Sequence, residues 1–427
     1  MINLRKLSLA VAAVVLPLLT FAQTSREEIY ADLNKAGGVY YAYPVSESLN
    51  TAPPKGYEPF YISHLGRHGS RYLITDNYYE WVLKLMRDAH DANALTEKGE
   101  DVLDRMEQVW MEAEARGGDL SPLGYRQHRG IAERMYAAYP QVFKGDAKIS
   151  ARSTMVMRCA ISMGAFCDRL KELNPKLQIT QEASNLYLRY LNYHSPESSM
   201  FNASDGPWAE EARKFEEANT DGSRLVASIF SDKKFITRHV NSHKFMWGMF
   251  WYAVGMQDIE TKVSFYDLFE KEELFNLWQS FNYRMYVRAG NCANNHGLMV
   301  ANARPLLRNI IESADEAISK GGVAATLRFA HDTNLIPLSA LLQLKDCDYA
   351  ESDPYETYKH FADFKVSPMA GNIQFIFFRN KKNADDVIVK VMLNERETSI
   401  PVKTDIAPFY RWKDVKAFYT DILNSKR

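Results

Sequence analysis

Short, largely apolar runs alternate with longer stretches of helical periodicity through the first and last thirds of the chain. The runs at residues 59–65, 148–151 and 325–330 are brief and are followed by polar residues, which is typical of buried strands. Apolar residues at helical spacing cover 121–139 and 305–320, between these strands. Strands that alternate with helices predict an α/β fold with an open, mostly parallel sheet flanked by helices.

Turn and capping residues sharpen several of these boundaries. Ser121 and Pro122 suit the N-cap and the first position of a helix, because proline lacks the N–H that this position leaves unused. Residues 372–379 and 387–393 have the pattern of two strands joined by a polar hairpin turn. Residues 23–56 show no period, and their Gly-Gly and Pro-Pro pairs mark turns, so we expect irregular structure there.

The middle of the chain interrupts this alternation. Residues 184–295 are rich in aromatic side chains and helical patterns, and they show little strand-like alternation. We interpret them as a mainly helical cap inserted into the α/β domain, with the aromatic residues forming its core. The predicted organisation is a signal peptide at 1–22, a first α/β part at 23–183, the cap at 184–295 and a second α/β part at 296–427.

The first residues have the pattern of a secretory signal peptide. Arg5 and Lys6 precede an apolar stretch over 7–21, and the small residue Ala22 suits the cleavage position. A membrane anchor is the alternative, but the stretch is short for a span and contains Pro17. We therefore expect cleavage, export to the periplasm or the extracellular space, and no stable membrane span.

Composition and charge exclude some classes of partner. The chain has 427 residues, of which 46% are hydrophobic and 25% charged, as in ordinary globular proteins. Loss of the signal peptide removes two positive charges and no acid, so the formal charge changes from −1 to −3. This balance argues against a nucleic-acid-binding protein. Any site for an anion must therefore be built locally.

The cysteines do not indicate a metal site. Cys159 and Cys167 share one predicted helix, and at 1.5 Å per residue they lie roughly 12 Å apart, too far for a disulfide. Pairing of either with Cys292 or Cys347 stays open. The four cysteines and the histidines show no zinc-ligand spacing, so we expect no metal.

Three polar clusters follow the predicted strands: RHGSR at 67–71, RSTMVMR at 152–158 and HD at 331–332. Open α/β sheets bind ligands beyond the carboxyl ends of their strands. Each cluster alone has an ordinary explanation, such as ion pairs, solvated arginines or a structural His–Asp pair. Together they bring several cations, two histidines and one carboxylate to one point, which suits a dianionic phosphoryl group. A histidine nucleophile and a carboxylic acid that protonates the leaving alcohol complete the chemistry.

These clusters resemble known motifs. RHGSR is similar to the RHGxR signature of the histidine phosphatase superfamily, and FAHDTNL resembles the HD motif of its acid phosphatase and phytase branch. RSTMVMRC resembles the RSTxxxRT segment of that branch, and the similarities span about residues 57–393. Within the branch, RHGSRY is most similar to the multiple inositol polyphosphate phosphatases, whose motif has a tyrosine at the position of Tyr72.

The resemblance implies a role for each matching residue. His68 would attack phosphorus and carry the phosphoryl group as phosphohistidine, and Asp332 would protonate the leaving oxygen. Arg152 would support the residues that contact the phosphoryl group without contacting that group itself. No metal or cofactor is implied, because positive charge comes from the residues that would hold the phosphoryl oxygens: Arg67, Arg71, Arg158 and His331.

The sequence departs from the family at two places. Leu73 stands where the family usually has proline. The inositol polyphosphate phosphatases commonly carry His-Ala-Glu where this chain has His331-Asp332, a form shared with general acid phosphatases. We therefore expect an exported phosphomonoesterase with an acid optimum that acts on inositol polyphosphates such as phytate. The alternatives are a broad-specificity histidine acid phosphatase, a phosphotransferase or mutase of the same superfamily, and an inactive phospho-ligand binding protein.

A multiply charged substrate would require cations beyond the catalytic set. The sequence offers several candidates, and each has a solvated side chain as its ordinary explanation: Lys55, Arg189, Arg284, Arg288 and Arg304.

Overall fold

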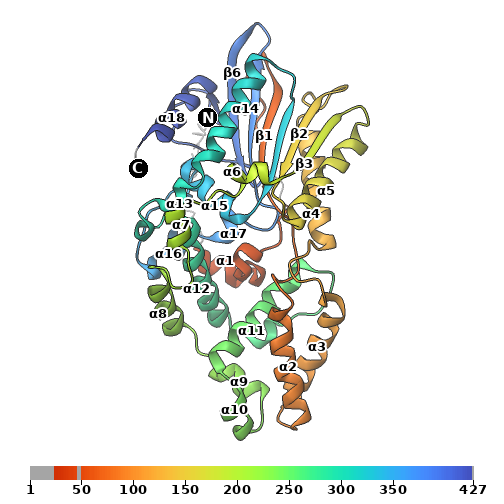
Figure 1. The fold of residues 1–427 in the computed structure, drawn as a ribbon, viewed down its shortest axis with the longest axis vertical. Coiled ribbons are helices and arrows are strands. Elements are labelled where there is room, and N and C mark those ends of the chain that lie inside the picture. The colour runs from red at the N-terminus through yellow and green to blue at the C-terminus, as the bar shows by residue number, and fades with distance from the viewer. Residues whose placement is uncertain (1–23, 46–49, 426–427) are drawn as a thin grey trace, which may run out of the picture.

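The computed structural model describes residues 24–45 and 50–425, and the predicted signal peptide lies outside the described residues. The strands of this part form one eight-stranded sheet in the order β3-β2-β4-β1-β5-β6-β7, with β8 paired to β6 (Figure 1). The strands are β1 (Tyr57–Arg67), β2 (Lys148–Ser153), β3 (Gln178–Ala183), β4 (Ala325–Ala330), β5 (Asn372–Asn380), β6 (Asn383–Leu393), β7 (Arg396–Glu397) and β8 (Phe409–Arg411).

Parallel pairing occurs in the half of the sheet that carries the polar clusters. Strands β3, β2, β4 and β1 are parallel neighbours, so their carboxyl ends meet at one edge. Strands β5 and β6 form the predicted hairpin, and β5 joins the other side of β1 in antiparallel orientation. The predicted α/β class and the open sheet flanked by helices are confirmed.

Helices cover both faces of the sheet (Figure 1). One face carries α4 (Pro122–Ala138) and α5 (Met157–Leu173), and the other carries α14 (Arg304–Ser319), α15 (Asp332–Leu341) and α18 (Trp412–Asn424). The side chain of Ser121 accepts a hydrogen bond from the N–H of Gly124 at the start of α4, which confirms the predicted cap.

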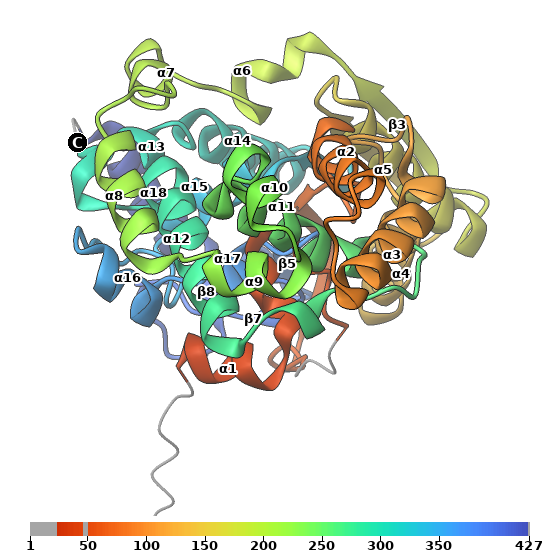
Figure 2. The ribbon, with the colours of Figure 1, turned by 90° about the horizontal axis from the view of Figure 1, so that it is seen from below.

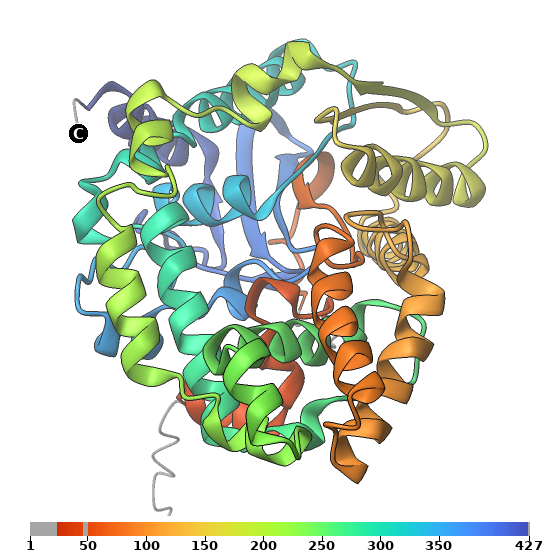
Figure 3. The same cartoon turned by 60° about the horizontal axis from the view of Figure 1, so that its bottom comes forward.

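The inserted helices from 209 to 289 extend away from the sheet (Figures 1 and 3), whereas the short helix at Leu188–Leu191 contacts β4. Helices α2 and α3, from the first α/β part, pack against α11 and α9, so the helical end draws on both segments. Seen from below, α11 lies between α2 and α12 (Figure 2). The helices of this end are α2 (Asn77–Asp91), α3 (Glu97–Ala113), α8 (Ala209–Asn219), α9 (Ser223–Ile229), α10 (Lys233–His239), α11 (Ser242–Gly255) and α12 (Lys271–Ala289).

Aromatic residues of this end pack mainly in its core, as predicted. Trp208, Trp247 and Trp278 are buried, whereas Trp251 is half-buried. Shorter helices connect the two ends: α6 (Leu188–Leu191), α7 (Pro196–Phe201), α13 (Leu298–Ala301), α16 (Pro354–His360) and α17 (Asp363–Val366), with 3₁₀ turns at Asn185–Tyr187, Met256–Asp258, Tyr266–Leu268 and Ala293–Asn295.

The prediction of irregular structure over 23–56 is wrong for its first half. Helix α1 (Ser25–Ala31) begins with a capping box in which Thr24 and Glu27 exchange hydrogen bonds, and a 3₁₀ segment, η1 (Leu33–Tyr40), follows it. The Gly-Gly pair forms a kink within this segment, where Gly38 has a φ of 58°. The kink leads the chain to Tyr40, which borders the site described below.

The four cysteines are buried free thiols, and Cys159 and Cys167 share α5 as predicted. Among the described residues, no helix has the length and apolar character needed to cross a membrane.

Candidate active site

The three polar clusters meet at the carboxyl edge of the parallel strands. The backbone N–H of His68, just past β1, donates to the carbonyl of Ala330 at the end of β4 at 3.1 Å. On the other side of β4, the N–H of Thr154 donates to the carbonyl of Phe329 at 3.2 Å. The rings of His68 and His331 lie 5.7 Å apart between centroids. The parallel register therefore places the ends of β1, β2 and β4 around one point.

The His68 ring is held in one tautomer. Its Nδ1 lies 2.9 Å from the carbonyl oxygen of Gly69. A carbonyl oxygen only accepts hydrogen bonds, so Nδ1 carries the proton of the neutral ring. The lone pair is consequently on Nε2, the nitrogen available for bond formation with an electrophile.

The surroundings of His68 favour the neutral ring. Burial lowers the pKa of His68 well below its usual value, and the positive charges of Arg67, Arg158 and Arg71 lower it further. Its nucleophilic form therefore persists at acid pH, where an exposed histidine would be protonated.

Arg67 connects the two ends of the site. It is 1% exposed, its Nη1 donates to the carbonyls of Val39 and Ser367, and its Nη2 forms an ion pair with Asp332 at 2.9 Å. Asp332 is the first residue of α15 and accepts a hydrogen bond from the N–H of Thr333 at 2.7 Å. The guanidinium of Arg67 is thus fixed between the backbone and a carboxylate.

Opposing effects act on the Asp332 carboxyl. Burial raises its pKa, but the positive charges of Arg67, His331 and Arg71 lower it, and the net direction is downward. Asp332 is therefore ionised while it is paired with Arg67. It can hold a proton near neutral pH only if another anion competes for that arginine.

Arg71 is supported by a residue that sequence reasoning missed. Its Nη2 donates to the hydroxyl of Tyr40 at 3.1 Å, and its guanidinium carbon lies 4.7 Å from the centre of the Tyr40 ring. Its Nη1 donates to the carbonyl of Tyr72 at 2.8 Å. Tyr40 comes from η1, in the stretch expected to be irregular, so nothing in its local sequence indicated this contact.

His331 and Arg158 complete the cluster. His331 is the N-cap of α15, and its Nε2 lies 3.3 Å from the hydroxyl of Thr154. Burial lowers the pKa of His331 to about 4. Arg158, in the first turn of α5, contacts the carbonyl of Gly118 at 3.5 Å, and its charge acts on both histidines.

The three arginines hold unused donors. The Nε atoms of Arg67, Arg71 and Arg158 are buried and have no hydrogen-bond partner among the described residues. Buried donors are normally paired, since an unpaired one costs about 1–3 kcal/mol. Unpaired guanidinium donors beside a free imidazole Nε2 suit a group with several acceptor oxygens and a negative charge.

A second buried carboxyl fixes the loop after β1. The Ser70 hydroxyl donates to Oδ1 of Asp258 at 2.5 Å and accepts from the side-chain amide of Gln127 at 2.8 Å. Burial raises the pKa of Asp258 to about 8, although Ser70 and Arg71 act to lower it. Sequence reasoning missed Asp258, which lies 188 residues from Ser70.

Two other residues near the motifs lie away from the cluster. The Nη1 of Arg152 donates to the hydroxyl of Tyr190 at 3.2 Å, and its guanidinium lies over the ring of Tyr187. The hydroxyl of the buried Tyr72 accepts from Arg116 at 2.7 Å and donates to Glu112 at 3.1 Å, so it is engaged by these residues rather than by those around His68. The contacts of Arg152 do not extend to the residues around His68.

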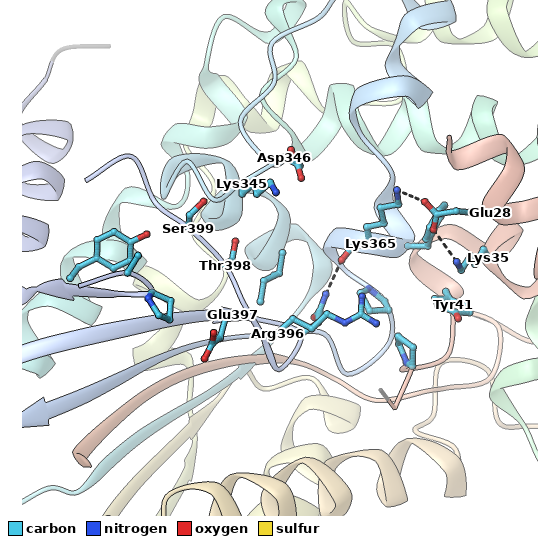
Figure 4. A pocket seen from close by; sticks show the side chains of 18 residues that line it. Glu28, Lys35, Tyr41, Lys345, Asp346, Lys365, Arg396, Glu397, Thr398 and Ser399 are labelled. Carbon is cyan, nitrogen blue, oxygen red and sulfur yellow. Dashed lines mark hydrogen bonds and ion pairs between the residues drawn. The ribbon is translucent and has the colours of Figure 1, made fainter. Parts of the chain in front are cut away.

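A cavity of about 840 Å³ adjoins the same part of the fold but contains none of the predicted site residues (Figure 4). It borders Pro368, one residue from the carbonyl that holds Arg67. Its Lys35 and Lys365 both pair with Glu28, so each of these cations already has a carboxylate partner. No group of three or more histidine, cysteine, aspartate or glutamate residues in the described part of the chain is arranged to hold a metal ion.

Comparison with known proteins agrees with this geometry. The family model of the histidine phosphatase superfamily (branch 2) matches residues 62–394, a range that includes every residue of the cluster. Multiple inositol polyphosphate phosphatase 1 of Gallus gallus is 20% identical over 330 residues, 72% of this chain and 70% of that protein.

Two solved structures share the fold. The Bifidobacterium longum multiple inositol polyphosphate phosphatase, in a complex with inositol hexasulfate, has a TM-score of 0.74 and 18% identity, covering 90% of this chain and 97% of that one. The phytase from D. castellii has a TM-score of 0.68 and 13% identity, covering 92% and 86%. At these identities the likeness establishes the fold of the chain and leaves its substrate to the chemistry of the site.

Proposed function

The chain belongs to the histidine phosphatase superfamily (branch 2) and hydrolyses phosphomonoesters, and we propose that its substrates are inositol polyphosphates such as phytate, cleaved through a phosphohistidine on His68. The observation that carries this proposal is the set of unpaired Nε donors of Arg67, Arg71 and Arg158 around the free Nε2 of His68. A phosphoryl group supplies the oxygens that these donors lack.

In the first step, Nε2 of His68 bonds to phosphorus as the bond from phosphorus to the ester oxygen breaks. The imidazole becomes cationic, because its proton stays on Nδ1, which donates a hydrogen bond to the carbonyl oxygen of Gly69. The arginines and His331 stabilise the charge on the three phosphoryl oxygens, where preorganised donors are most effective. The departing alkoxide receives its proton from Asp332.

Substrate binding prepares Asp332 for this role. A phosphate dianion near Arg67 competes for the guanidinium that lowers the pKa of Asp332. The carboxyl then gains a proton together with the substrate. In the second step the resulting carboxylate takes a proton from water, whose oxygen attacks phosphorus and releases phosphate from His68. We expect an acid optimum, because the phosphorylation step needs protonated Asp332.

Two relatives support inositol polyphosphates as the substrates. The Gallus gallus protein is a multiple inositol polyphosphate phosphatase, and the Bifidobacterium longum structure contains inositol hexasulfate, an analogue with sulfate in place of phosphate. The dipeptide His331-Asp332 favours the second candidate, a broad-specificity acid phosphatase, because its short carboxyl is the form found in general acid phosphatases.

Phosphate release across pH separates these candidates. The protein without residues 1–22 is incubated with inositol hexakisphosphate or with glycerol 2-phosphate, and kcat/KM is measured from pH 3 to pH 9. A preference for the hexakisphosphate supports the proposal, and a preference for the simple ester favours the acid phosphatase. Alkaline quenching and mass spectrometry of the His68 peptide test for the phosphohistidine. An unmodified peptide during steady turnover contradicts the covalent step.

We also propose that the protein is exported, on the sequence of residues 1–22. Cell fractionation of the full chain, followed by N-terminal sequencing, tests this. A mature protein that starts at Gln23 outside the cytoplasm is the expected result, and an uncleaved cytoplasmic chain contradicts it.

A further inference from the structure

Arg288 is a half-buried cation of α12, the helix of the helical end that packs against α15. It lies in the last turn of α12, its guanidinium carbon is 4.9 Å from the centre of the Trp208 ring, and its Nε donates to Oδ1 of Asn202 at 3.2 Å. An aromatic ring and an amide therefore fix the plane of the guanidinium. Its two Nη groups make no hydrogen bond within the described part of the chain.

Arg288 is half-buried and has no described carboxylate partner, unlike Arg213 and Arg284 of the same end. Arg213 pairs with Glu210 and Glu217, and Arg284 pairs with Glu216 at 3.4 Å. No described carboxylate lies within ion-pair distance of Arg288. A partly desolvated cation without a counter-charge is unfavourable. An anionic ligand would remove this penalty.

The charges that act on Arg288 locate it relative to the cluster. Burial lowers its pKa, Arg284 lowers it further, and the carboxylate of Asp332 raises it. Helix α12 packs against α15, which Asp332 begins. Arg288 is therefore close enough to sense the group that faces the leaving oxygen, while the largest charge effects on His68 come from Arg67, Arg158, Arg71 and His331.

Arg284 extends this positive surface along the same helix. It lies one turn before Arg288, on the same face of α12. Its charge lowers the pKa of Tyr78 on α2, a residue that also senses Arg71. The two arginines thus form a row along α12 from the side of Asp332 toward α2, in which Arg284 is paired with Glu216 and Arg288 has no described carboxylate partner.

We propose that Arg288, assisted by Arg284, binds a second phosphate group of the substrate on the side where the alcohol leaves, so that the enzyme prefers substrates with more than one phosphate. This inference rests on the proposed phosphatase function. The planar guanidinium offers two Nη groups to one phosphate, which is the geometry that arginine uses for bidentate recognition. Of the five candidate cations in the sequence, the structure selects these two; Arg304, for example, donates to the carbonyl of Ser425 at the far end of α18.

The test compares Arg288→Gln with the unchanged protein on two alkyl esters, inositol hexakisphosphate and glycerol 2-phosphate. Both release an alkoxide, so an effect that acts through Asp332 would lower both rates. We expect kcat/KM for the hexakisphosphate to fall about 10–100-fold, mainly through KM, as for loss of a charge-assisted contact. The rate on glycerol 2-phosphate should change less than about twofold. Arg288→Lys should restore part of the loss, because it keeps the charge without the planar fork.

Arg213→Gln is the matched control, since this arginine is exposed on α8 and already paired with two glutamates. It should change both rates by less than about twofold. Equal losses on both substrates in Arg288→Gln, or no loss on the hexakisphosphate, would overturn the inference. Thermal melting of each variant shows whether the fold is retained.

A sugar bisphosphate and its monophosphate distinguish this inference from the proposed substrate class. If the unchanged protein ignores inositol hexakisphosphate, the inositol proposal fails. A preference for the bisphosphate that disappears in Arg288→Gln still supports a second phosphate site. If the unchanged protein shows no preference for the bisphosphate, the second site fails as well.

Discussion

Arg67, at the carboxyl edge of the parallel strands, and Arg288, on α12 of the helical end, are held in different ways. At the end of β1, Arg67 is almost fully buried and is fixed by backbone carbonyls and by Asp332. In the last turn of α12, Arg288 is half-buried and is held by two side chains, Trp208 and Asn202. A transferred phosphoryl group needs donors that do not move during the reaction, because reorganisation would raise the barrier. A spectator phosphate needs only attraction, so an adaptable side chain is sufficient there.

His68→Ala should have the largest effect and should act on every substrate, because it removes the proposed nucleophile. We expect kcat to fall by at least about 10³-fold on inositol hexakisphosphate and glycerol 2-phosphate alike. Phosphate release from purified protein measures this. A variant that loses activity on only one of the two esters would mean that His68 acts in substrate recognition, as proposed for Arg288, and not in the reaction itself.

Asp332→Asn should affect poor leaving groups most. Removing the proposed proton donor should lower kcat on alkyl esters about 10²–10⁴-fold and should lower it much less on 4-nitrophenyl phosphate, whose phenolate leaves without a proton. The acid dependence of the alkyl ester reaction should also disappear. An equal loss on both kinds of ester would show that Asp332 mainly positions Arg67.

Asp258→Asn should change the pH dependence of stability. The folded chain keeps a proton on Asp258 up to about pH 8, whereas the unfolded chain loses it near the usual pKa of 3.8. The unfolding free energy should therefore fall as pH rises between these values, by on the order of a few kcal/mol, and the variant should not show this fall. Urea unfolding at pH 5 and pH 8 measures the difference. Parallel losses in both proteins would contradict a buried neutral carboxyl beside Ser70.

Tyr40→Phe should have the smallest effect. It removes one hydrogen bond to Arg71 and keeps the ring that stacks on it, so kcat should fall by about two- to tenfold. Tyr41→Phe is the control, because the Tyr41 hydroxyl donates to Asp32 instead. Similar losses in the two variants would mean that the support of Arg71 does not depend on Tyr40.

The local sequence pattern was enough to predict the parallel strands and the polar clusters at their ends. The strands at 59–65, 148–151 and 325–330 were predicted within a few residues, and the polar clusters follow them directly. Parallel strands bring their carboxyl ends to one edge, so residues distant in the chain converge by a general rule. The prediction for residues 23–56 failed because glycine pairs mark kinks within 3₁₀ segments as well as loops.

The sequence by itself determined the α/β class, the hairpin, the helix cap at Ser121 and the six residues of the cluster, because each depends on neighbours in the chain or on a contiguous motif. Only the tertiary structure decided which other residues support them. Ser70 meets Asp258 across 188 positions, and Arg288 approaches Asp332 through the packing of α12 on α15. Such contacts depend on how helices dock, and the sequence pattern of a helix specifies its buried face but not the residue that lies opposite.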